Sequence, residues 1–148
     1  MSENLKLMRF YFWILALFTI GRWGLSLGGA DYSKTREVFS LVILSFIASA
    51  HHAAFARAFA GYNLKRALGL GATIGLVTQV VVFGSTAISY LFGLHTFFNA
   101  SEAIARQAEP LAFGAAMGQR AIGLVVNVIL NTIAAAIGYA MGAALPKK

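Results

Sequence analysis

The chain has 148 residues, of which 59% are apolar and 11% are charged, whereas an ordinary soluble domain carries about 25% charged residues. So few charges cannot cover the surface of a soluble protein of this length with water-compatible groups. The absence of cysteine excludes disulfides, thiolate metal sites and cysteine nucleophiles.

Four apolar segments each have about the 20 residues that a helix needs to cross a bilayer. They lie approximately at residues 8–27, 38–60, 67–94 and 121–145. None alternates with period two, so we expect helices and not the strands of an outer-membrane barrel. The first segment resembles a secretory signal, but Arg22 and Trp23 interrupt it, and we treat it as a retained helix. The sequence predicts an all-α, polytopic membrane protein, with residues 1–148 forming one four-transmembrane-helix bundle.

The basic residues are distributed unequally between the two sides of this bundle. The side with both termini and the second connection carries seven basic residues, including Lys147 and Lys148, and one acid. The other side carries five basic residues and four acids. Because cytoplasmic loops are enriched in Lys and Arg, we expect an inner-membrane protein with both termini cytoplasmic. The high pI then reflects contact with the lipid bilayer, and we expect no nucleic-acid partner.

The third connection, residues 95–120, is the only long one. Asn99 followed by Glu102 is typical of a helix start, and Glu102 and Arg106 have the spacing of a favourable ion pair. Pro110 should end this short interfacial helix. The apolar stretch 111–118 then has three interpretations: an extension of the fourth helix, a re-entrant piece, or a segment lying in the interface. The interfacial placement is the one we expect.

Glycines recur at a spacing of four, which allows close approach of helices in lipid. Most such pairs should pack within one chain, although a small bundle favours a homo-oligomer or association with other membrane subunits. The pairs are Gly24 and Gly28, Gly71 and Gly75, Gly114 and Gly118, and Gly138 and Gly142.

Neutral polar residues at membrane depth are the best pointers to function, because hydrocarbon offers them no partner. They are either interhelical hydrogen-bonding groups or the lining of a path or binding cavity for a small polar or anionic solute. For the second interpretation the candidates are His52, Gln79, Asn127 and Asn131. Arg22 and Arg120, near span ends on one side, would together attract an anion.

No carboxylate lies at the centre of a span, and no H-E-x-x-H or G-x-S-x-G motif occurs. We therefore favour a non-enzymatic oligomeric membrane protein with a channel-like or transporter-like path or cavity. Two alternatives stay open: an accessory or scaffold subunit of a larger membrane complex, and a small lipid- or quinone-handling enzyme. No metal site is expected, and haem would require ligation by His52 between subunits.

Overall fold

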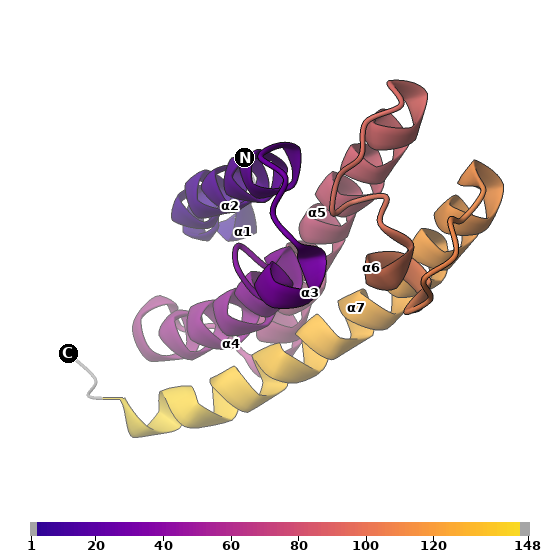
Figure 1. Ribbon diagram of the computed structural model, residues 1–148. Helices are drawn as coiled ribbons and strands as arrows, with labels where there is room; N and C mark the ends of the chain where they lie inside the picture. Colours follow the sequence, from indigo (N-terminus) through magenta and orange to yellow (C-terminus); the bar gives the residue numbers. More distant parts are fainter. Residues whose placement is uncertain (1–2, 146–148) are drawn as a thin grey trace.

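The computed structural model describes residues 3–145, and in this range it is helical without any strand. The elements in chain order (Figure 1) are α1 Glu3–Leu7, α2 Arg9–Leu27, α3 Tyr32–Thr35, α4 Leu41–Ala60, α5 Leu64–Leu91, α6 Ser101–Ala105, α7 Phe113–Met141 and the 3-10 turn η1 Gly142–Ala144. Four of them, α2, α4, α5 and α7 with η1, are long and apolar enough to cross a membrane. The predicted all-α, four-span fold is confirmed. Lys147 and Lys148 lie outside the described residues.

The turn between α4 and α5 is set by two residues. Gly61 ends α4 in the left-handed conformation, with φ 65°, which glycine adopts without steric cost. The Asn63 side chain accepts a hydrogen bond from the backbone N–H of Arg66 at 2.9 Å and so caps the start of α5. These local signals make α4 and α5 antiparallel neighbours and start the third span at Leu64, before the expected residue 67.

The fourth spanning helix begins at Phe113 instead of the expected residue 121. The prediction that residues 111–118 form an interfacial segment is therefore wrong, because most of this stretch forms the first two turns of α7. Pro110 lies just before the helix, and Ala112 is extended with ψ 149°. Once the helix has started, each further turn satisfies its own backbone groups, which a flat non-helical segment cannot do.

The short helix expected in the third connection is present as α6, but its details differ from the prediction. Its N-cap is Ala100 and not Asn99. Asn99 instead closes the preceding turn, accepting from the Thr96 N–H at 2.8 Å. Arg106 has left the helix with φ 56°, so the expected ion pair with Glu102 is not among the ion pairs of residues 3–145.

Helices α4, α5 and α7 pack closely because glycine lies where they meet. A Cβ added at Gly138 would lie 2.0 Å from the carbonyl oxygen of Ala50 on α4, and one at Gly71 would lie 2.6 Å from that of Asn131 on α7. By contrast, Gly114 and Gly118 have no such neighbour within 4 Å. Two of the four glycine pairs thus make contacts between helices of the same chain. The expected association with another subunit stays a prediction.

Helix α2 packs against this three-helix group through larger side chains. Met8, Tyr11 and Leu15 are buried in one cluster with Leu70 and Ile74 of α5. The large side chains keep α2 further from its neighbours than the glycine contacts keep α4 from α7. This spacing leaves room for a groove beside α2.

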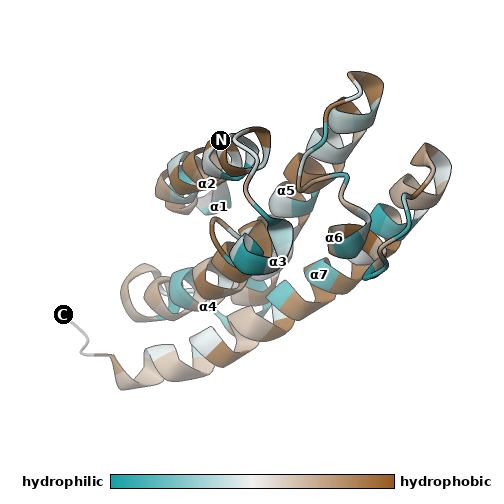
Figure 2. Ribbon diagram, in the orientation of Figure 1, coloured by the Kyte–Doolittle hydropathy of each residue, from teal (hydrophilic) through white to brown (hydrophobic). Residues whose placement is uncertain are grey.

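The two ends of the bundle differ in chain length and polarity. We call the end formed by residues 28–40 and 92–112 the loop end, and the opposite end, with both chain termini, the terminal end. Figure 2 shows hydrophilic residues concentrated on α3, on α6 and on the segment before α7, and hydrophobic residues along the long helices. At the loop end α5 and α7 diverge, and the segment carrying α6 lies between them (Figure 1).

Candidate functional site

The polar residues inside the bundle form one compact network around Asn131. The side chain of Asn131 is fully buried. Its Oδ1 accepts from the Ser49 hydroxyl at 2.7 Å, and its Nδ2 donates to Ser45 Oγ at 3.2 Å and to the Asn127 carbonyl at 2.8 Å. The Asn127 amide itself donates to the Gly123 carbonyl at 2.8 Å. This network ties α4 to α7 with its hydrogen-bonding groups already satisfied.

His52 and Gln79 do not join this network. His52 is half-buried on the side of α4 that faces α2, with its ring edge-on to Tyr11 at a centroid distance of 6.2 Å. Gln79 is 4% exposed on α5, and its side chain makes no hydrogen bond with residues 3–145. The structure thus brings Asn127 and Asn131 together and leaves the other two candidates apart. Residues 3–145 also contain no group of three or more His, Asp or Glu side chains suited to a metal ion.

The two arginines expected to attract an anion lie at the loop end, and Arg22 is only 8% exposed. One terminal nitrogen of Arg22 donates to the carbonyls of Arg36 and Val38, both at 3.1 Å. Its guanidinium carbon lies 5.7 Å from the ring centroid of Tyr32 and 5.3 Å from that of Phe97, within cation–π range. Arg22 is therefore held rigidly between α2 and both loops of this end.

Arg120, on α7, is held in the same way by the third connection and α5. Its Nε donates to Thr86 Oγ1 at 3.0 Å, and a terminal nitrogen donates to the Phe98 carbonyl at 2.8 Å. Thr86 also donates to the Phe98 carbonyl, at 2.9 Å. Since Arg120 lies two turns into α7, the early start of that helix is what carries its side chain to α5.

Both guanidinium groups line one cavity of about 230 Å³, which we call the arginine cavity. Residues from α2, α4, α5, α6, α7 and both loops contribute to it. Its lining consists of Arg22, Tyr32, Arg36, Ser40, Leu41, Val42, Val82, Phe97, Phe98, Ala103 and Arg120. No carboxylate belongs to this lining. The two arginines therefore have no carboxylate partner within the cavity lining.

Each arginine of the pair keeps hydrogen-bond donors in reserve. A guanidinium has five N–H groups. Arg22 uses one terminal nitrogen for two backbone carbonyls and also hydrogen-bonds the Tyr32 side chain, while Arg120 uses Nε and one terminal nitrogen. The two charges also repel each other. Arg36 differs, because its Nε lies 3.4 Å from Glu37 at the exposed rim. Unused donors and a lining without a carboxylate make the cavity a candidate site for an anion.

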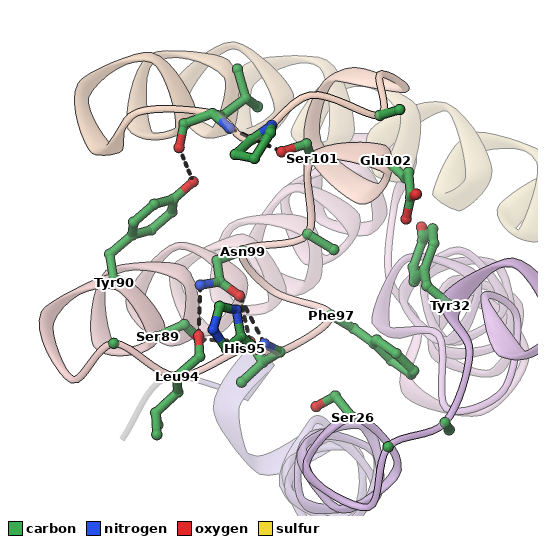
Figure 3. Close-up of a pocket in the computed structure, with 18 residues that line it drawn as sticks. Ser26, Tyr32, Ser89, Tyr90, Leu94, His95, Phe97, Asn99, Ser101 and Glu102 are labelled. Carbon is green, nitrogen blue, oxygen red and sulfur yellow. Dashed lines mark hydrogen bonds between the residues drawn. The ribbon is translucent and has the colours of Figure 1, made fainter.

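A larger pocket of about 590 Å³ lies next to the arginine cavity at the same end. It is bounded by the turn after α2, the end of α5 and the third connection (Figure 3). Tyr32 and Phe97 line both spaces, with their rings edge to face at a centroid distance of 5.4 Å. These two rings, which lie on one side of the pocket in Figure 3, therefore form the wall shared by the outer pocket and the arginine cavity.

Sequence reasoning identified Arg22 and Arg120 but not the residues that surround them. Tyr32 and Phe97 are aromatic residues of the kind enriched at membrane interfaces. That enrichment does not reveal that the two rings enclose an arginine. A second signal was present in the sequence, since both arginines lie on the side with the longer connections. It predicts proximity to loops but not a common cavity.

No protein-family model matches the chain, and neither curated proteins nor solved structures show a significant similarity to it.

Proposed function

We propose that this integral membrane protein binds a small oxyanion in the arginine cavity. One observation carries the proposal: Arg22 and Arg120 are held on a cavity at the loop end, with donors unused and no carboxylate in the lining. A buried charge without a partner is costly. An anion in the cavity would supply the missing partner for both side chains.

The chemistry of guanidinium narrows the ligand to an oxyanion. Its planar fork of N–H groups matches the oxygens of carboxylate and phosphate, and it is less strongly hydrated than an ammonium group. The hydroxyl-bearing Tyr32 and Ser40 in the lining add neutral donors. A free phosphate and the phosphate of a lipid headgroup share this chemistry.

Binding fits the geometry better than a passive path lined by His52, Gln79, Asn127 and Asn131. The Asn131 network is fully buried and bonded to itself, so it offers no free donors to a passing solute. His52 faces α2, away from this network.

The experiment uses the fluorescence of Trp23, whose ring lies 5.5 Å from that of the cavity residue Phe98. In a Trp13→Phe background Trp23 is the sole tryptophan. The purified protein is titrated in neutral-lipid nanodiscs with inorganic phosphate, and in a second arm with a short-chain phosphatidic acid. Saturable binding in the first arm indicates a free anion, and saturable binding in the second alone indicates a lipid headgroup.

Arg120→Gln is the test substitution, because glutamine can still donate to the Phe98 carbonyl while the charge is lost. Charge-assisted hydrogen bonds contribute about 1.5–3 kcal/mol, so the affinity should fall roughly tenfold to a hundredfold. Arg57→Gln is the matched control: Arg57 also donates to a backbone carbonyl, that of Tyr139 at 2.8 Å, but at the terminal end. Absence of binding in both arms, or equal loss in both variants, would refute the proposal and leave the arginines as structural groups of a scaffold.

A further inference from the structure

A second cavity, unrelated to the arginine cavity, lies between α2 and α4 on the lipid-facing side of the bundle. It is a groove of about 320 Å³, within the range of small-molecule sites. Its apolar walls come mainly from Phe10 and Ile14 of α2 and from Ile47 and Phe55 of α4. Phe10 and Ile47 are 71% and 64% exposed, so the groove opens toward lipid. No residue is common to the linings of the two cavities.

Two histidines line the groove, His51 and His52, and the hydrogen bonding of the second one defines its role. Its Nδ1 lies 2.8 Å from the Ala48 carbonyl oxygen. Because a carbonyl can only accept, Nδ1 must carry the proton, and Nε2 of the neutral ring is then an acceptor. Within residues 3–145 Nε2 has no hydrogen-bond partner. The Tyr11 hydroxyl, which also lines the groove, is already engaged with Thr78.

Depth in the membrane limits what can bind there. At a rise of 1.5 Å per residue, His52 lies about 12 Å along the axis from Ala60, where α4 ends. A charged headgroup at that depth in hydrocarbon is costly, and no Lys, Arg, Asp or Glu lines the groove to offset the cost. The groove therefore disfavours a charged group beside His52 and favours a molecule whose polar head there is neutral.

We propose that this groove binds a neutral amphiphile whose polar head is a single hydroxyl, such as a long-chain phenol or alcohol. The O–H of the head donates to Nε2 of His52, and the apolar body lies along Phe10, Ile14 and Ile47. The match is one donor to the Nε2 acceptor of His52, in a groove whose other polar side chains are His51 and Tyr11. This site is independent of the anion site and stands whether or not an oxyanion binds.

The test compares 4-octylphenol with its methyl ether, 4-octylanisole, in which a methyl group replaces the donated proton. Each competes with a photoreactive alkyl diazirine for labelling of the full-length protein in nanodiscs of a neutral phospholipid. Affinities are referred to the concentration of each probe in the lipid, which protein-free nanodiscs provide. A neutral hydrogen bond should make the phenol bind about threefold to tenfold more tightly than the ether.

His52→Phe keeps a flat ring and removes the acceptor, so the ratio of the two affinities should fall to about one. His95→Phe is the control, because His95 is exposed at the loop end and lines the outer pocket, and there the ratio should not change. Ile47→Trp, at a site exposed to lipid, fills the groove without altering the core and should abolish competition by both probes. Equal affinities for the two probes, a ratio that survives His52→Phe, or labelling unchanged by Ile47→Trp would each overturn the proposal.

Discussion

Gly138→Ala tests the closest contact between two spanning helices. The added Cβ would lie 2.0 Å from the carbonyl oxygen and 2.6 Å from the Cα of Ala50. Ordinary contact begins at 3.4 Å, and the atoms in the way are backbone, which cannot rotate aside. Helices α4 and α7 must therefore separate by about an ångström, because a packed interior deforms little.

Two effects contribute to the loss of stability in Gly138→Ala. Forcing an extra carbon into a packed interface costs about 1–3 kcal/mol. Separation of the helices also stretches the hydrogen bonds that Ser45 and Ser49 make with Asn131, and each such bond in a membrane contributes about 0.6 kcal/mol on average. We expect the free energy of unfolding to fall by about 2–4 kcal/mol.

Gly123→Ala is the matched control on the same helix. Nothing lies within 4 Å of a Cβ at this position, so the substitution should only improve helix propensity, by about 0.5–1 kcal/mol. The same chemical change should thus stabilise at one site and destabilise at the other. Reversible unfolding by SDS in mixed micelles, followed by circular dichroism, measures both. Equal effects of the two substitutions would refute the close α4–α7 contact.

Two further predictions concern the buried network and the loop end. Asn131→Leu should lower the free energy of unfolding by about 1–3 kcal/mol, because Ser49 loses its hydrogen-bond partner. Phosphate binding in the Trp23 titration should stay unchanged. Loss of that binding would place Asn131 in the anion site. Hydrogen bonds from Ser33 lower the pKa of the Asp31 carboxyl below its ordinary value of 3.8. The ionised carboxylate therefore stabilises the start of α3 fully above pH 3.8, and this stabilisation is lost as the pH falls through the lowered pKa. A carboxyl titration by NMR checks this, and a midpoint at or above 3.8 would contradict it.

Hydropathy was sufficient to predict the spans, because a helix in lipid must satisfy its own backbone and must be apolar over its full length. It failed for residues 113–120, where composition is moderately apolar and a helix, an interfacial segment and a re-entrant segment all satisfy the pattern. The choice there depends on tertiary contacts. Arg120 reaches Thr86 and Phe98 only if α7 has already begun, and no local signal encodes those partners.

The candidate site shows the same division between local and tertiary information. Placing Asn127 and Asn131 on one helix face requires only the helical period, and the structure brings them together. Placing His52 beside them required knowledge of which face of α4 meets α7. Gly138 and Gly142 decide that face through their contacts with Ala50 and Ala54, and this turns His52 toward α2.

At the loop end two arginines of like charge line one cavity, and a bound anion would offset their repulsion. Folding places the like charges of Arg22 and Arg120 on one cavity, where they repel each other, and their partners there are backbone carbonyls and the rings of Tyr32 and Phe97, none of which carries a full negative charge. An oxyanion that binds only the folded protein would offset the repulsion and stabilise the fold, by about 2.7 kcal/mol at a hundredfold excess over the dissociation constant. Arg57, which stacks on Tyr139 at 4.3 Å and donates to its carbonyl, meets its partners within the protein. The loop-end arginines also have carbonyl and ring partners within the protein, but two of them line one cavity without a carboxylate, so an anion bound there would meet both charges.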